Sequence, residues 1–287
     1  MTDPPPRSVP MTIIDAQIHV WSPDVSTRPW PPGRTRHAHG PALGAEQVLR
    51  VMDDAGVARA VLVPPSWPGD DNTDALAAAR AWPDRFAVMG RFDPKAPGAE
   101  AQLAKWRDQP GMLGVRLTFH LPLWAAWLTD GSLDWFWAAA ERASLPLMIF
   151  VPGQASAVGP IAARHPRLRL VLDHLARRGE LKDDEAFGDL DEVLALARHP
   201  NVAMKVSALP CYSSEPYPFP KLTKHIRRVW EAFGPRRMLW GTDYSRLPVP
   251  YRDAVRHVRE GLDFLSKDDR EWIMGRACAE WVGWRLP

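Results

Sequence analysis

The chain has 287 residues, of which 46% are hydrophobic and 24% charged, a composition typical of a globular protein with a large buried core. Its 36 Lys and Arg residues nearly balance 34 Asp and Glu residues, which leaves a formal net charge of +2. Without a long basic run, the sequence excludes an electrostatic nucleic-acid or membrane surface and favours a small-molecule partner.

The cysteines and the N-terminus indicate where the protein works. Cys211 and Cys278 are far apart and form no C-x-x-C motif, so we expect neither a disulfide framework nor a structural zinc site. Residues 1–10 are polar and proline-rich, without the apolar stretch of a secretory signal. No apolar run approaches the roughly 20 residues that span a bilayer. We therefore expect a cytoplasmic protein whose residues 1–10 form a disordered tail.

Short aliphatic and β-branched runs alternate with amphipathic stretches almost from end to end, a pattern typical of βα units and a parallel sheet. The runs predicted as strands are Ile13–Val20, Ala60–Pro64, Phe86–Phe92, Leu113–Thr118, Leu147–Val151, Leu168–Leu172, Val202–Ser207 and Arg237–Thr242. The stretches predicted as helices include Gly44–Ala55, Thr73–Trp82, Ala99–Arg107, Ser132–Ala143, Ala186–Arg198, Lys221–Phe233, Tyr251–Leu265 and Asp268–Trp281.

The number of strands decides between two α/β architectures. Eight βα repeats favour closure into a (β/α)8 TIM barrel, which uses about 250 residues as one unit. An open doubly wound sheet is the alternative, but its first strand is typically followed by a glycine-rich turn, and residues 17–23 contain no glycine. No linker divides the chain, so we expect a single α/β barrel domain over residues 11–287.

The carboxyl ends of barrel strands carry the active site, and polar residues follow nearly every strand here. The i, i+2 spacing of Gln17 and His19 places both side chains on one face of the first strand. His174 follows the sixth strand and Asp243 the eighth. A lone strand histidine is usually a hydrogen-bonded core residue. The convergence of four polar groups instead favours a catalytic site made of these residues.

Further polar side chains near the same strand ends are candidates for substrate binding: Arg91, Arg116, His120, Lys205, Tyr212 and Arg246. A lysine within an apolar strand needs a partner when it is buried, and Asp243 or an acidic substrate would serve Lys205. The structural alternatives are an internal ion pair of Lys205 and pairing of Arg116 with Asp93. Asp173 is expected to orient a loop instead of reacting.

Four other histidines are interpreted as structural or loop residues. His37 and His39 form an H-x-H pair, but they lie in a loop rich in Pro, Gly and Arg. His165 and His199 each precede a proline at a predicted helix end, where histidine suits the helix dipole.

Three segments resemble a known family. They are residues 14–21 (IDAQIHVW), residues 171–175 (VLDHL) and residues 240–243 (WGTD). Together they look like the amidohydrolase superfamily, specifically its amidohydrolase-2 branch of sugar lactonases and 2-pyrone-4,6-dicarboxylate lactonase. The similarity runs over almost the whole chain, including residues 275–280 (GRACAE). The resemblance implies an amidohydrolase-like barrel with hydrolase activity.

The sequence departs from the metal-dependent members of that family. Those members carry H-x-H on the first strand, and here Gln17 replaces the first histidine. Arg116 matches the fourth-strand Lys or Glu that bridges two metals in binuclear members, and residues 150–152 offer no ligand. The remaining ligand candidates are His19, His174 and Asp243, whereas a catalytic zinc usually holds three protein ligands plus water. We therefore expect no metal or other cofactor, with a single divalent zinc ion as the alternative.

The lactonases of this branch include enzymes that work without metal, and the resemblance implies similar chemistry here. Asp243 would act as the general base that activates water, with His19, His174 and Gln17 near the substrate carbonyl. The predicted cationic residues favour an anionic substrate, because arginine binds carboxylates through two hydrogen bonds. We therefore expect hydrolysis of a lactone or similar cyclic ester, either carboxylated or derived from a sugar.

Two other functions remain as alternatives. A metal-dependent decarboxylase or amidohydrolase of the same branch would contain stoichiometric zinc or manganese. A barrel that only binds an acidic ligand is the second, although the presence of His19, His174, Lys205 and Asp243 argues against it because buried polar groups are costly. A homo-oligomer stays open because many soluble proteins assemble as symmetric copies.

Overall fold

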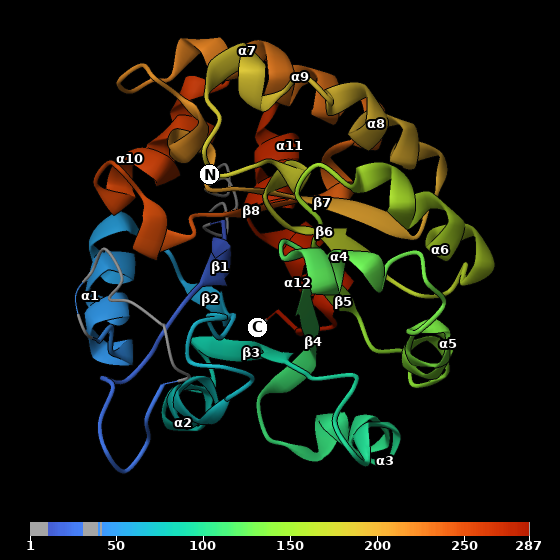
Figure 1. Ribbon diagram of the computed structural model, residues 1–287. Helices are drawn as coiled ribbons and strands as arrows, with labels where there is room; N and C mark the ends of the chain where they lie inside the picture. The colour runs from blue at the N-terminus through green and yellow to red at the C-terminus, as the bar shows by residue number, and fades with distance from the viewer. Residues whose placement is uncertain (1–10, 31–39, 41, 287) are drawn as a thin grey trace, which may run out of the picture.

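Eight parallel strands lie at the centre of the described part of the chain, and helices surround them (Figure 1). The computed structural model describes residues 11–30, 40 and 42–286. The strands are β1 (Ile14–Ile18), β2 (Arg59–Leu62), β3 (Phe86–Arg91), β4 (Met112–Thr118), β5 (Leu147–Phe150), β6 (Leu170–Leu172), β7 (Val202–Ser207) and β8 (Met238–Gly241). The predicted (β/α)8 barrel is confirmed. The predicted tail, together with His37 and His39, lies outside the described residues.

The helices agree less closely with the prediction. Their bounds are α1 (Ala45–Ala55), α2 (Thr73–Ala81), α3 (Ala99–Ala104), α4 (Pro122–Ala126), α5 (Asp134–Arg142), α6 (Val158–Arg164), α7 (Asp183–Ala186), α8 (Leu190–Leu194), α9 (Pro220–Phe233), α10 (Tyr251–Arg256), α11 (Lys267–Glu271) and α12 (Ala277–Val282). The predicted helix Ala186–Arg198 divides, with α8 at its centre. The short α4 and α6 were not predicted because a proline lies in the first turn of each, where it is tolerated. None of the described helices is both long and apolar enough to cross a membrane.

The strands pair in chain order, so each is hydrogen-bonded to the next along the sequence. Side chains that point outward pack against the helices, while a second cluster of apolar side chains fills the barrel interior. That interior cluster includes Ile14, Val61, Met148 and Leu239, and α12 contributes Ala277, Cys278, Trp281 and Val282 to it. The amino ends of the strands are thus filled with apolar residues, which leaves the carboxyl ends for polar groups.

Asp15 joins the first strand to the last and so closes the barrel. Its Oδ1 accepts hydrogen bonds from the backbone N–H groups of Gln17 and Thr242, both at 2.9 Å. Its Oδ2 accepts from the hydroxyls of Thr242 at 2.5 Å and Tyr251 at 2.9 Å. The strands approach closely here, because a Cβ atom added to Gly241 would lie 2.9 Å from the backbone nitrogen of Gln17. Glycine is therefore required at this position.

Replacing Asp15 separates the role of its shape from that of its charge. In Asp15→Asn, the amide oxygen can still accept from both backbone N–H groups, and the two hydroxyls can rotate to accept from the amide. Asp15→Ala leaves these buried donors unsatisfied, at about 1–3 kcal/mol for each group. We expect Asp15→Ala to lower the free energy of unfolding by at least about 3 kcal/mol and Asp15→Asn by roughly 1 kcal/mol or less. Urea unfolding measures both, and equal losses would contradict the account.

The same pair predicts a pH dependence. Burial raises the pKa of Asp15 to about 6 despite its hydrogen bonds, whereas the unfolded chain has a value of about 3.9. The folded protein therefore keeps this proton to higher pH than the unfolded chain does. The wild type should lose stability relative to Asp15→Asn as the pH rises from about 4 to about 6, with a constant difference above that range. A difference that does not change with pH would show that Asp15 titrates normally.

Candidate active site

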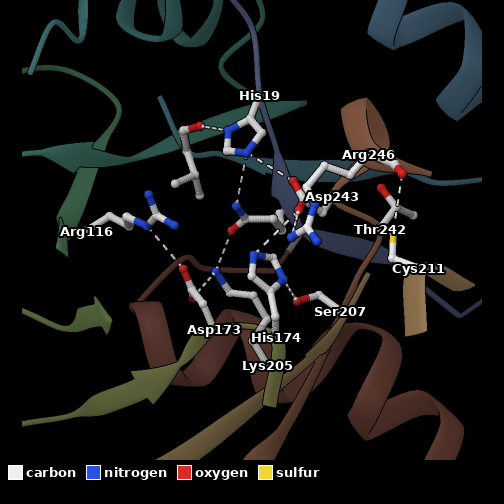
Figure 2. Close-up of polar contacts among 12 residues, drawn as sticks. His19, Arg116, Asp173, His174, Lys205, Ser207, Cys211, Thr242, Asp243 and Arg246 are labelled. Atoms are coloured by element: carbon white, nitrogen blue, oxygen red, sulfur yellow. Dashed lines mark hydrogen bonds and ion pairs between the residues drawn. The ribbon is translucent and has the colours of Figure 1, made fainter. Parts of the chain in front are cut away.

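His19 follows β1, and both nitrogens of its ring have partners. Nδ1 donates a hydrogen bond to the backbone carbonyl of Val63. Nε2 lies 3.0 Å from Oδ1 of Asp243 (Figure 2). The ring of Trp67 packs edge-on against the imidazole, with ring centroids 5.9 Å apart. The structure therefore brings the polar residues after the first and last strands together, and it holds the His19 ring in one orientation.

Asp243 lies at the centre of this cluster and is only 1% exposed. Its Oδ2 lies 3.6 Å from Nε2 of His174 and 3.3 Å from Nη1 of Arg246. Burial alone raises the pKa of a carboxyl group, but the imidazoles of His174 and His19 and the Arg246 guanidinium outweigh it. Together they hold the pKa of Asp243 well below its usual range. Asp243 is therefore an ionised carboxylate at neutral pH.

His174 reaches this carboxylate from a left-handed turn after β6. The φ angles of His174, Leu175 and Ala176 are 54°, 55° and 57°, a region that residues with a Cβ atom rarely adopt. Such strain is concentrated at functional sites, where it aims a particular side chain. Here the turn directs the imidazole at Asp243 (Figure 2). Burial lowers the pKa of His174 to about 3, so its ring is neutral near pH 7.

Ser207 is a residue of this cluster that the sequence did not single out. It ends β7, and its Oγ lies 2.8 Å from Nδ1 of His174. Because Nε2 of His174 faces the Asp243 carboxylate, the favoured tautomer has hydrogen on Nε2 and accepts a hydrogen bond from Ser207 at Nδ1. The i, i+2 spacing of Lys205 and Ser207 places both side chains on one face of β7. The histidine partner of Ser207, however, comes from the neighbouring strand.

Lys205 and Arg116 share one internal carboxylate, that of Asp173. Lys205 Nζ lies 2.7 Å from Oδ1, and Arg116 Nε donates to Oδ2 at 3.2 Å. Against the effect of burial, these two cations hold the pKa of Asp173 below its usual value. Lys205 also donates to Oε1 of Gln17 at 2.7 Å, and its side chain is completely enclosed. The result is a buried network that extends from β4 across β6 and β7 to β1.

Two predicted pairings are therefore wrong. Lys205 was expected to pair with Asp243 or a substrate acid, and pairing with Asp93 was the structural alternative for Arg116, but Asp173 is the carboxylate partner of both. The reason is that Asp173 points into the barrel interior from the end of β6, within reach of two strands that are distant in sequence. Asp173 was expected to orient a loop, and its main contacts are instead these cations.

Gln17 connects this network to His19. An ammonium group only donates hydrogen bonds, so the Gln17 amide oxygen faces Lys205 and its amide nitrogen faces Nε2 of His19 at 3.5 Å. The predicted same-face arrangement of Gln17 and His19 is present. Gln17 is fully buried, and its oxygen is turned away from the cluster around Asp243.

A pocket of about 580 Å³, which we call the mouth pocket, opens beside Arg246. Its polar and aromatic lining includes His120, Phe150, Gln154, Arg178, Glu180 and Arg246. The ring of Phe150 packs edge-on against His174, with centroids 5.4 Å apart, so the pocket adjoins the cluster around Asp243. Arg178, which the sequence did not single out, lines this pocket together with the predicted His120 and Arg246.

The other predicted substrate-binding residues lie elsewhere. Arg91 donates to Oδ1 of Asp70 at 2.8 Å and lines a separate pocket of about 290 Å³. Tyr212 is fully buried, and burial raises the pKa of its hydroxyl above the usual value. Neither residue lines the mouth pocket.

The side chains around Asp243 share one feature with a metal site and differ in two. His19 makes a contact typical of a metal ligand, because Nδ1 donates to a carbonyl and leaves Nε2 directed inward. However, Arg246 places a positive charge against Asp243, and the Gln17 oxygen is bound to Lys205. Within the described residues, no three His, Cys, Asp or Glu side chains are arranged to hold a metal ion. Among the described residues, this arrangement does not fit a metal centre.

Lys205→Met tests whether Lys205 serves structure or substrate. The substitution leaves Asp173 with one cation instead of two, in an enclosed site, and removing one partner of a buried pair costs about 3–5 kcal/mol. We expect that loss in urea unfolding followed by tryptophan fluorescence. As a control, Lys221→Met removes an exposed pair with Asp183 and should cost less than about 1 kcal/mol. Unchanged stability of Lys205→Met together with a raised KM would instead assign Lys205 to substrate binding.

Comparisons with known proteins agree with the fold. An amidohydrolase family model matches residues 14–284. The L-fucono-1,5-lactonase of Burkholderia ambifaria is 30% identical over 280 residues, which cover 92% of this chain and 93% of that protein. A probable 2-pyrone-4,6-dicarboxylic acid hydrolase from Acinetobacter baumannii, with citric acid bound, has a similar fold. Its TM-score is 0.78 at 21% identity, over 96% of this chain and 100% of that chain. An amidohydrolase from Burkholderia multivorans with bound zinc has a TM-score of 0.79 at 20% identity, over the same shares. The chain belongs to the amidohydrolase family.

Proposed function

We propose that this protein hydrolyses a lactone or similar cyclic ester, with Asp243 as the general base that activates a water molecule. The observation that carries the proposal is the ionised carboxylate at the barrel mouth, contacted by two imidazoles and a guanidinium. The activity of the 30% identical relative, an L-fucono-1,5-lactonase, supports opening of a cyclic ester ring.

The reaction moves one proton from water to the ring oxygen. Asp243 takes this proton as the water oxygen attacks the carbonyl carbon, which forms a tetrahedral oxyanion. When the ring C–O bond breaks, the leaving oxygen takes the proton from Asp243. A carboxyl group with a pKa well below its usual range is a weak base but, once protonated, a strong acid. The environment of Asp243 therefore favours the second transfer, protonation of the leaving group.

The residues around Asp243 supply donors for the oxyanion. Arg246 contacts Asp243 and also lines the mouth pocket, so its guanidinium lies where a bound carbonyl would develop negative charge. His174 contributes an Nε2–H group on the β6 side, while His19 and Gln17 lie on the β1 side. One donor of this kind contributes about 2.7–4 kcal/mol to stabilising the transition state.

We propose that the reaction needs no metal. The support for this is Gln17, which replaces a histidine and turns its amide oxygen toward Lys205. In this arrangement the positive charge near Asp243 comes from Arg246. Guanidinium and imidazole donors would then stabilise the oxyanion.

Asp243→Asn tests the general base. Asn has nearly the same shape and tolerates the left-handed backbone at this position, where φ is 52°, so the variant should fold. We expect kcat to fall by about 10²–10⁴-fold, the usual contribution of general base catalysis. Acid release from sugar lactones and pyrone carboxylates measures it, with the exposed Asp183→Asn as a control. Rates within twofold of wild type would refute the assignment. Binding of acids without any turnover would favour the ligand-binding alternative.

Treatment with a chelator tests the proposed independence from metal. The purified protein, dialysed against a strong chelator and then freed of it, should keep its full lactonase activity. Metal content is measured in parallel by elemental analysis. Stoichiometric zinc or manganese, combined with loss of activity that the metal restores, would instead favour the metal-dependent decarboxylase or amidohydrolase.

A further inference from the structure

Arg178 differs from the other cations near the catalytic cluster because its charge is not used within the protein. It is exposed and lines the mouth pocket, and it forms no ion pair or hydrogen bond with any residue that the structure describes. Its neighbour Arg177, by contrast, is buried and donates to the backbone carbonyls of Leu175 and Ala186. Two adjacent arginines thus have different roles, since one stabilises the loop after β6 and the other presents its guanidinium to the pocket.

Two glycines allow the guanidiniums of Arg178 and Arg246 to lie against backbone at the pocket wall. A Cβ atom added to Gly153 would lie 2.6 Å from both Nε and Nη2 of Arg178. A Cβ atom added to Gly179 would lie 2.8 Å from Nη2 of Arg246. Any larger residue would displace the guanidinium it touches. The absence of side chains at these two positions therefore makes room for two cations on one pocket.

The charges of the pocket favour an anionic ligand with a flat apolar part. Arg178 and Arg246 outnumber the one acidic residue among the lining residues, Glu180, which forms no ion pair with either arginine. Phe150 supplies an aromatic face between the pocket and His174. A guanidinium without a carboxylate partner matches the two oxygens of a carboxylate with two parallel hydrogen bonds.

We propose that Arg178 binds the carboxylate of an acidic lactone and so selects acidic over neutral lactones. This inference rests on the proposed lactonase function and names its substrate class. With the carboxylate on Arg178, the ester carbonyl extends past Phe150 toward Arg246 and Asp243. A neutral sugar lactone would instead use its hydroxyl groups on Gln154 and Glu180, and the experiment below separates the two.

The experiment compares lactones that differ only in one carboxylate. One pair is D-glucaro-1,4-lactone and D-glucono-1,4-lactone, and a second is 2-pyrone-6-carboxylate and 6-methyl-2-pyrone. For the pair that the enzyme opens, we expect the wild type to prefer the acid by at least about tenfold in kcat/KM. Arg178→Gln should lower kcat/KM for the acid by about 10–100-fold, mainly through KM, and change the neutral lactone by less than twofold. Arg228→Gln, which removes an exposed arginine outside the mouth pocket, is the matched control and should leave kcat/KM for the acid within twofold of wild type.

Glycine variants test the same proposal without removing the arginine. Gly153→Ala introduces a methyl group where the Arg178 guanidinium lies, at a position with φ of 67°. Gly131→Ala carries a similar backbone strain, with φ of 77°, but its methyl group would meet only Asp134 Oδ2 at 3.7 Å, an ordinary contact. We expect Gly153→Ala to reproduce the selective loss on the acid, and Gly131→Ala to reproduce only any loss of stability. Equal kinetic effects of the two variants would overturn the assignment.

The outcomes distinguish this inference from the proposed function. If Asp243→Asn abolishes lactone hydrolysis but Arg178→Gln affects acidic and neutral lactones equally, the lactonase proposal stands and the role of Arg178 is wrong. A wild-type preference for the neutral lactone also overturns the proposed role of Arg178. If the enzyme opens none of the four lactones, calorimetric titration with each of them still tests whether Arg178 binds a carboxylate. If only the acids bind, and Arg178→Gln no longer binds them, the carboxylate site is supported although the lactonase proposal fails. Any other binding pattern overturns the role of Arg178.

Discussion

The buried carboxylate of Asp15 is the contact on which the site depends, because it fixes the seam between β1 and β8. Four hydrogen bonds from β1, β8 and α10 meet on its two oxygens. One residue beyond this seam on the β8 side, the backbone N–H of Asp243 donates to the carbonyl of Gln17 at 2.9 Å. His19 and Asp243 therefore approach within 3.0 Å although 224 positions separate them. Closure of the barrel therefore also assembles the cluster around Asp243.

Two carboxylates in the same barrel take different roles because their partners differ. Asp173 is neutralised by Lys205 and Arg116 in an enclosed network, which suits a structural ion cluster. Asp243 contacts two imidazoles and the partly exposed Arg246, which also lines the mouth pocket. A carboxylate whose cationic partner also lines a pocket can be approached by a ligand. A carboxylate enclosed between two buried cations instead stabilises the packing of the strands. The structure therefore separates the proposed general base, Asp243, from the stabilising carboxylate of Asp173.

Backbone strain orients two side chains of the candidate site. His174 and Asp243 both follow directly on strands and both have positive φ angles, 54° and 52°. If the backbone stayed extended after the strand, each side chain would point to the face set by the alternation of side chains along that strand. The left-handed conformation redirects it toward the shared centre, and the folded surroundings must offset its cost. Sequence periodicity carries no signal of such a conformation, although Asp and His adopt it more readily than most residues with a Cβ atom.

The sequence by itself predicted the barrel, since eight βα repeats without a glycine-rich turn after the first strand favour closure over an open sheet. It also located Gln17, His19, His174 and Asp243, because strand ends and i, i+2 spacing are local properties. Only the tertiary structure decided the partners. Lys205 pairs with Asp173, Ser207 contacts His174, and Arg178 lines the mouth pocket next to Gly153. Ion pairs and close backbone approaches join residues from different βα units, and their choice depends on distances that a linear pattern does not contain.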